Sequence, residues 1–247
     1  MPYTVYQPQQ QLIPLAPDLW ITEGPLIRMA MGPLRVPFPT RMTVIRLSSG
    51  DLFVHSPIEP TPALLQAVAT LGRVQHLVSP NAIHYAWIPA WREAFPDAAA
   101  WASPGVRRRA RSQGIEVHFD ADLADSPDPA WADDVDQLIF RGSSVLEEVV
   151  FFHRASGTLI LTDLIENFEG PRTAPRWRWL LRLAGVLDPN GKAPADLRAT
   201  FFGRKAIARA CRDRMFAWNP DRVILAHGRY FETDGMAELR RAFRWLG

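Results

Sequence analysis

The sequence contains a single cysteine, Cys211, so no internal disulfide can form. A chain of 247 residues is long enough to bury a core without one. A lone thiol is typical of reducing compartments, and we predict a cytoplasmic location. The first residues lack the basic and apolar segments of a secretory leader, and no run of about 18 apolar residues occurs, so we expect no membrane span.

Lysine and net charge are also scarce. Only Lys192 and Lys205 accompany the many arginines, and the formal net charge is +2. This balance does not favour a nucleic-acid partner, and we expect a small-molecule substrate of unknown class. Hydrophobic residues make up 47% of the chain and charged residues 22%, which is ordinary globular composition. Because no long linker is evident, we predict one domain over residues 1–247, and the oligomeric state stays open.

Apolar runs and turn signals alternate along the chain. Strands are predicted at 17–24, 41–56, 74–79, 99–102, 136–140, 147–163 and 221–228, with hairpin turns at 48–51 and 154–157. Helices are predicted at 61–72, 87–98, 104–114, 174–185, 203–218 and 233–247, the last with a threonine cap, and 116–136 is expected to be a polar surface loop. The order of elements predicts an α/β fold of two sheets covered by helices.

Three polar residues follow apolar strand-like runs directly: His84, Asp163 and His227. Strand ends in layered α/β folds deliver side chains into a shared crevice, so we predict that these three converge. Two imidazoles and one carboxylate suit a catalytic zinc ion, and they suit iron or manganese equally. Such an ion lowers the pKa of its bound water and polarises a substrate oxygen.

Two segments resemble the second half of a metallo-β-lactamase-like domain, namely TLILTDLIENF and, about sixty residues later, RVILAHGRYF. The resemblance implies a four-layer αβ/βα sandwich in which two mixed sheets are flanked by helices. It also implies a strand-end Asp and a late His-Gly that hold metal, here Asp163 and His227. Three further segments are similar to an uncharacterised branch of that superfamily, a domain of unknown function: PFPTRMTVIRLSSGDLFVHSPI, VQHLVSPNAIH and EEVVFFHRASGTLILTDL.

The chain departs from the superfamily where its hydrolases usually carry His-x-His-x-Asp-His. The sequence there is PNAIHY, so His84 remains and Tyr85 replaces the second histidine that the branch typically keeps. Phenol and amide groups are poor substitutes for imidazole as zinc ligands, which argues against a dinuclear cage. We therefore predict one ion, held by His84, Asp163 and His227 with Glu148 as a fourth ligand, and a hydrolase in which Tyr85 donates to a developing oxyanion.

Other interpretations of the same residues stay open. His84 could cap a helix or form hydrogen bonds within a crevice, and Asp163 could cap the segment that follows it. The missing histidines favour a non-catalytic descendant that binds a small molecule or a protein in the former active-site crevice. The helix predicted at 176–185 mixes Arg and Trp, so it could pack on the core, cover a substrate pocket or lie on a membrane.

Overall fold

The computed structural model describes residues 3–31 and 34–247. Its larger sheet contains seven strands, in the order β1 (Leu12–Ala16), β2 (Leu19–Glu23), β5 (Arg41–Arg46), β6 (Asp51–His55), β7 (Arg73–Ser79), β8 (Ala99–Ala102) and β9 (Ala121–Asp122). Pairing is antiparallel from β1 to β6 and parallel from β6 to β9. The predicted hairpin at 48–51 therefore joins β5 and β6, as expected.

A second sheet contains four strands, in the order β10 (Val135–Phe140), β11 (Glu148–His153), β12 (Thr158–Leu161) and β13 (Arg222–Leu225). The hairpin at 154–157 makes β11 and β12 antiparallel, whereas β12 and β13 are parallel. Both sheets are therefore mixed. The strands β3 (Ile27–Met31) and β4 (Leu34–Phe38) pair only with each other, as a ribbon that the sequence patterns did not predict.

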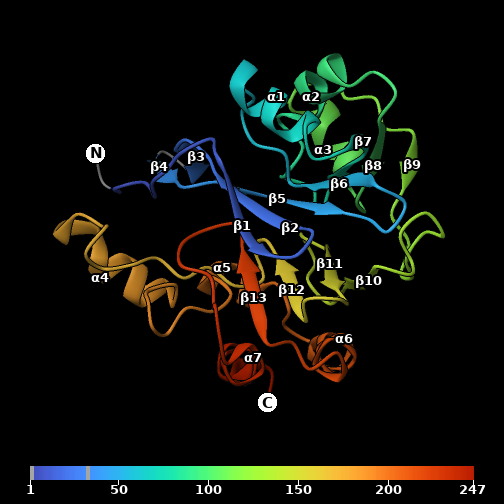
Figure 1. Cartoon of the computed structure of the whole chain (residues 1–247). Helices are drawn as coiled ribbons and strands as arrows, with labels where there is room; N and C mark the ends of the chain where they lie inside the picture. The colour runs from blue at the N-terminus through green and yellow to red at the C-terminus, as the bar shows by residue number, and fades with distance from the viewer. Residues whose placement is uncertain (1–2, 32–33) are drawn as a thin grey trace.

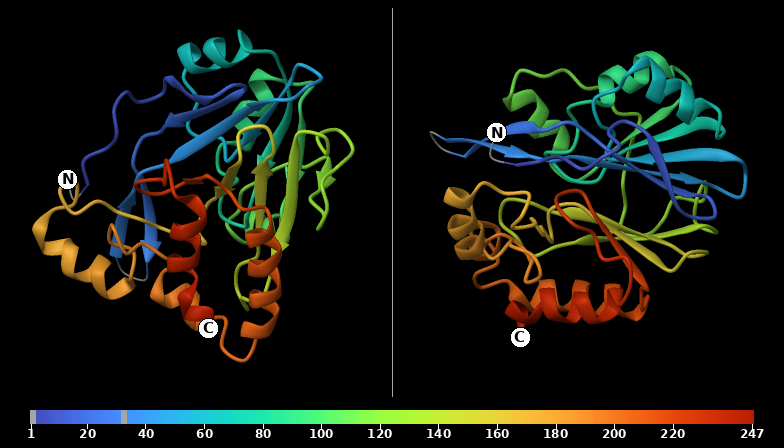
Figure 2. Two further views of the ribbon diagram at one scale, coloured as in Figure 1. Left: turned by 60° about the horizontal axis from the view of Figure 1, so that its bottom comes forward. Right: turned by 60° about the vertical axis from the view of Figure 1, so that its left-hand side comes forward.

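Helices cover the outer face of each sheet, which gives the four layers seen edge-on in Figure 2. The larger sheet is covered by α1 (Pro62–Ala69), α2 (Ile88–Ala94) and α3 (Val106–Ser112), and the smaller by α6 (Lys205–Ala217) and α7 (Gly235–Ala242) (Figure 1). The remaining helices are α4 (Pro175–Ala184), α5 (Ala195–Ala199) and the short 3₁₀ turn η1 (Arg244–Leu246). The predicted α/β sandwich of two mixed sheets flanked by helices is confirmed.

The strand β11 shows why the sheets stack in this way, because every one of its six residues is buried. Val149 and Phe151 pack between the two sheets, whereas Val150 and Phe152 face the helices on the other side. A strand that is covered on both faces has a continuous apolar run, which is the pattern that the sequence shows here.

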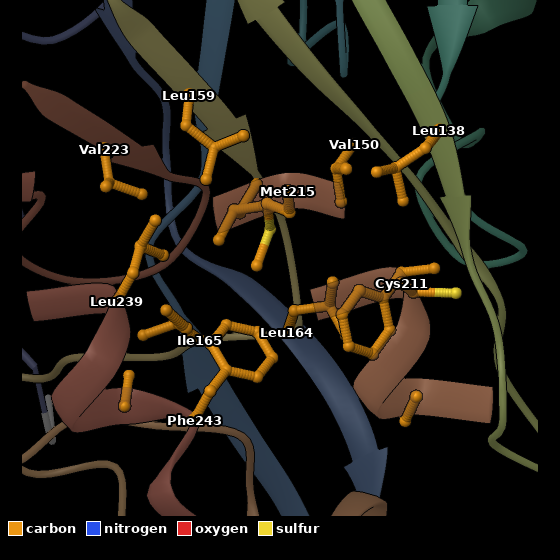
Figure 3. Packing of buried hydrophobic residues seen from close by; sticks show 14 of the residues in the cluster. Leu138, Val150, Leu159, Leu164, Ile165, Cys211, Met215, Val223, Leu239 and Phe243 are labelled. Atoms are coloured by element: carbon orange, nitrogen blue, oxygen red, sulfur yellow. The ribbon is translucent and has the colours of Figure 1, made fainter. Parts of the chain in front are cut away.

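The single cysteine lies in the apolar core under α6 and α7. Met215 and Cys211 of α6 meet Leu239 of α7 and the strand residues Leu159 and Val223 (Figure 3). The thiol of Cys211 lies 3.6 Å from the carbonyl oxygen of Ile139 and behaves as a small buried hydrophobe.

Two local predictions were wrong. Asp234, in a left-handed conformation, occupies the N-cap position of α7 and no side chain caps the helix, so Thr233 is not its cap. The segment 116–136 is not purely a surface loop, because Phe119, Leu123 and Trp131 are buried. The Trp131 indole N–H donates to Gln137 at 3.0 Å, which fixes this acidic segment against the core.

Candidate metal centre

The three strand-end residues that the sequence singled out lie together. Asp163 follows β12 and His227 follows the adjacent parallel strand β13, so both emerge from the same edge of the smaller sheet. His84 comes from the segment after β7 of the other sheet, and it completes the group across the gap between the sheets. One ligand atom from each residue lies within 4.8 Å of the others.

The two imidazoles face opposite oxygens of one carboxylate. The Nε2 atom of His84 lies 3.2 Å from Oδ2 of Asp163, and the Nε2 atom of His227 lies 3.2 Å from Oδ1. The His227 and Asp163 side chains are 1% and 7% exposed and the His84 side chain is 10% exposed, so all three are almost fully buried. A tetrahedral zinc ion with bonds of about 2.0–2.1 Å holds its ligand atoms about 3.3 Å apart. Each imidazole is at about that separation from one Asp163 oxygen, but the two oxygens differ, and one ligand atom from each of the three residues lies within 4.8 Å of the others.

The orientation of each ring is fixed by its other nitrogen. The Nδ1 atom of His227 lies 2.7 Å from the carbonyl oxygen of Pro39, which can only accept, so Nδ1 carries the proton. The Nδ1 atom of His84 lies 2.7 Å from the hydroxyl of Ser56. Metal-binding histidines are typically held in this way through the nitrogen that does not bind the ion.

The Nε2 atom of His227 is buried and has no hydrogen-bond partner among the described residues, since its approach to Asp163 is not aligned for one. In the neutral ring, this atom presents a lone pair to a carboxylate oxygen. Two facing lone pairs repel each other unless a cation or a proton lies between them. The atom therefore fits either a metal ion or an imidazolium.

The short distances between the three side chains also shift the pKa values of Asp163 and His227. Burial alone raises the pKa of Asp163, but the two imidazoles outweigh it and hold that pKa well below its usual range. Burial alone lowers the pKa of His227, yet the Asp163 carboxylate reverses the effect and raises it. Asp163 is thus an anion at neutral pH, the form that binds a metal ion.

Asn81 and Glu148 hold the segment that carries Asp163. The Asn81 amide donates to Asp163 Oδ2 at 2.6 Å and to the Thr162 hydroxyl at 2.8 Å. Glu148 accepts from the backbone N–H groups of Thr162 and Asp163, both at 2.7 Å, and of Leu164 at 3.2 Å. These contacts fix the orientation of the Asp163 side chain.

Glu148 and Tyr85 therefore lie differently from what a direct role requires. Both Glu148 oxygens are engaged by backbone donors, and this residue is not part of the group of three. Tyr85 is 6% exposed and packs in the apolar cluster under α1–α3, with Ile88 and Trp91. These contacts make Glu148 a support for Asp163 and make Tyr85 part of the core.

Sequence reasoning missed two side chains of the site. Ser56, which positions His84, directly follows β6, so the strand-end rule that selected the other three would have found it. Glu166 lines the cavity beside Asp163, and burial raises its pKa to about 8. Its position depends on a loop contact, in which its backbone N–H donates to the Lys192 carbonyl at 3.2 Å, and no local pattern predicts that contact.

A cavity of about 770 Å³ opens onto this group, with Asp163 and Glu166 in its wall. Most of its lining is apolar, and α4 supplies Trp177, Leu180 and Leu181. The Arg- and Trp-rich helix therefore covers a pocket, one of the three positions that the sequence left open. Across the described ranges 3–31 and 34–247, every helix is too short or too polar to cross a bilayer.

Sequence comparison assigns the chain to a protein family. The family model described as "Domain of unknown function (DUF4336)" matches residues 28–176, more than half of the chain. The chain belongs to this family. The matched segment includes His84, Glu148 and Asp163, whereas His227 lies beyond it. No curated protein matches the sequence.

Solved structures of metallo-β-lactamases resemble the fold over nearly the whole chain. DIM-1 metallo-β-lactamase exposed to ceftazidime matches with a TM-score of 0.65 and 12% identity, covering 97% of each chain. A metallo-β-lactamase from Erythrobacter litoralis matches with a TM-score of 0.65 and 14% identity over 98% of this chain and 99% of its own. FIM-1 from Pseudomonas aeruginosa, in its mono-zinc form, gives 0.61 and 14% over 100% and 95%. The chain therefore has the metallo-β-lactamase fold.

Another buried histidine near the centre, His55, gives a pH prediction. Its side chain packs edge-to-face on Phe151 with ring centroids 5.4 Å apart, and burial, with a contribution from His84, lowers its pKa to about 3. The unfolded chain binds this proton near pH 6.5, while the folded state binds it only near pH 3. Stability from His55 is therefore full above pH 6.5 and is lost as the pH falls toward 3.

Lowering the pH from 7 to 5 should cost the metal-free protein about 2 kcal/mol through His55 alone. Urea unfolding of wild type and His55→Leu at both pH values, with chelator present, measures this term. We expect the wild type to lose about 2 kcal/mol more than the variant over this interval. Equal losses in the two proteins would show that His55 is protonated in the folded state.

Proposed function

We propose that this DUF4336 protein is a metal-dependent hydrolase with one ion, zinc or else iron or manganese, held by His84, Asp163 and His227. The carrying observation is that three potential ligand atoms lie within 4.8 Å of one another while the buried Nε2 atom of His227 has no hydrogen-bond partner. Such an ion, when bound, lowers the pKa of a coordinated water and polarises the substrate oxygen, which suits ester, amide or phosphoester hydrolysis. The proposal takes residues 1–247 as one domain, and a cytoplasmic location stays a prediction.

The residues of this chain then have separate tasks. Pro39 and Ser56 orient the two imidazoles so that both Nε2 atoms face the Asp163 carboxylate. Glu148 and Asn81 hold Asp163, which supplies the negative charge. The apolar cavity excludes water around a bound substrate, which strengthens electrostatic interactions at the reacting group. We leave Glu148 out of the ligand set because its oxygens already accept backbone hydrogen bonds.

A second function is supported by one observation. If both histidines are protonated, Asp163 pairs with two imidazolium rings, and the triad needs no metal. The raised pKa of His227 fits that arrangement. The protein would then be a non-catalytic member of the fold that binds a small molecule or a protein in the cavity.

Metal content distinguishes the two functions. Protein purified without a histidine tag should contain about one equivalent of zinc, iron or manganese by elemental analysis. His84→Ala and His227→Ala should each weaken zinc binding more than about 100-fold, as measured by competition with a chromogenic chelator. Hydrolysis of nitrophenyl esters and phosphoesters by the loaded protein then tests the reaction.

His118→Ala is the matched control, because the His118 side chain is 74% exposed and its ring pairs with Asp120 at 3.2 Å, away from the group of three. It should bind metal as the wild type does. Circular dichroism and thermal unfolding separate the loss of a ligand from the loss of the fold in the two site variants. A wild type that stays metal-free after incubation with all three ions, and whose histidine variants melt as it does, would exclude the hydrolase and leave the binding function.

A further inference from the structure

Two cavities meet beside the proposed metal centre, and they differ in chemistry. The apolar cavity of about 770 Å³ shares part of its wall with a groove of about 650 Å³ along α3. The shared residues are Ala82, Arg109, Val145 and Leu146. Ala82 precedes His84 by two positions, so the junction of the two cavities lies next to the proposed reaction site.

The groove carries an excess of positive charge. Arg108 and Arg109 of α3 and Arg204 before α6 line it, against one carboxylate, Glu147. Within residues 3–31 and 34–247, no ion pair engages any of these three guanidinium groups, although neighbouring Arg107 pairs with Asp122 at 3.1 Å. All three arginines are exposed in this groove, and arginines without carboxylate partners favour the binding of an anion such as a carboxylate, phosphate or sulfonate.

The other cavity favours a hydrocarbon body. Leu180, Leu181 and Trp177 of α4 meet Phe168 and Val186 around it, and its volume is in the range of pockets that enclose small organic ligands. No residue of α4 is fully buried, so the inner face of this helix is available to a ligand.

We propose that the substrates are amphiphilic anions, with an apolar chain or ring under α4, a carboxylate, phosphate or sulfonate at Arg108, Arg109 and Arg204, and the scissile bond between them near Asp163. The proposal rests on the proposed hydrolase function, since it names the substrate class of that site. The apolar part supplies affinity through burial, and the arginines select the charged end and orient the bond toward the imidazoles.

Two fluorescent probes with the same aromatic body test the two halves separately. Anilinonaphthalene sulfonate carries an anion, whereas N-phenylnaphthylamine is neutral, and both are titrated into metal-free protein in the presence of a chelator. Wild type should bind the sulfonate more tightly than the neutral probe. Arg109→Gln should weaken sulfonate binding about fivefold and leave the neutral probe unchanged.

Matched controls come from the same two helices. Arg111 lies on α3 but lines neither cavity, so Arg111→Gln should change neither dissociation constant. Leu180→Gln should weaken the binding of both probes. Leu183→Gln should weaken the binding of neither, because Leu183 is 69% exposed and does not line the apolar cavity. Equal effects of Arg109→Gln and Arg111→Gln, or of Leu180→Gln and Leu183→Gln, would overturn the proposal. Since no metal is present, these results do not depend on whether the protein is a hydrolase.

Discussion

Gly228→Ala should destabilise the protein by about 3 kcal/mol or more and should abolish the metal binding proposed at His227. Gly228 follows His227 directly and has a φ of +85°, in the left-handed region where a Cβ atom costs about 1–2 kcal/mol. A Cβ atom there would also lie 2.2 Å from the carbonyl oxygen and 2.5 Å from the carbonyl carbon of Asn167. This neighbour is backbone, so it cannot rotate away.

The clash acts on the site because the same backbone holds it in place. The Arg229 N–H donates to the Asn167 carbonyl at 2.8 Å, and the Asn167 N–H donates to the His227 carbonyl at 3.3 Å. Moving Asn167 to admit a methyl group would break both hydrogen bonds and would turn the His227 ring away from Asp163. Urea unfolding measures the stability, and chelator competition measures zinc affinity.

Gly50→Ala separates backbone strain from the clash. Gly50 has a φ of +87°, nearly that of Gly228, but a Cβ atom there meets no heavy atom within 4 Å. This variant should lose only about 1–2 kcal/mol and should bind metal normally. If the two alanine variants are equally stable, the close approach at Asn167 is not what requires glycine at 228.

The group of His84, Asp163 and His227 could be predicted from the sequence because its residues follow the ends of strands. Asp163 and His227 each follow a short apolar run, and the parallel pairing of β12 with β13 brings the ends of such runs to one edge. The partners that orient the rings were harder to predict. Pro39 acts through its carbonyl oxygen, which every residue has, so no side-chain pattern marks its position.

Tertiary contacts also determine the features that local sequence patterns did not predict. Glu148 begins β11, in which Val150 and Phe152 face the helices, but which layer each face of the strand meets depends on how the sheets stack. The ribbon of β3 and β4 belongs to neither sheet, and Pro37 within β4 fits an edge strand rather than a core strand. Apolar residues do alternate along both segments, at 27, 29 and 31 and at 34, 36 and 38, but the prolines at 25, 33, 37 and 39 are turn signals that obscure the strands.

The buried pair Arg41 and Glu23 connects the larger sheet to His227, and Arg41→Met should cost about 3–5 kcal/mol. The Arg41 and Glu23 side chains are 1% and 6% exposed, with a guanidinium nitrogen 2.6 Å from the carboxylate. The guanidinium also donates to the Leu225 carbonyl, two residues before His227. Removing Arg41 leaves a buried carboxylate without its cation and frees the end of β13.

The pH dependence of that variant identifies the cause. Burial raises the pKa of Glu23 even with Arg41 present, and without the arginine it should rise further. A carboxyl group with a raised folded pKa stabilises the fold below its unfolded pKa and loses that contribution as the pH rises. The stability deficit of Arg41→Met relative to wild type should therefore be smaller at pH 5 than at pH 8, as measured by urea unfolding at both values.

The double variant Arg41→Met with Glu23→Leu removes both charges and should recover more than half of the lost stability, because an apolar pair can replace a buried ion pair at little cost. A deficit that is independent of pH and additive in the double variant would mean that lost packing around Arg41, rather than the stranded Glu23 charge, destabilises the protein.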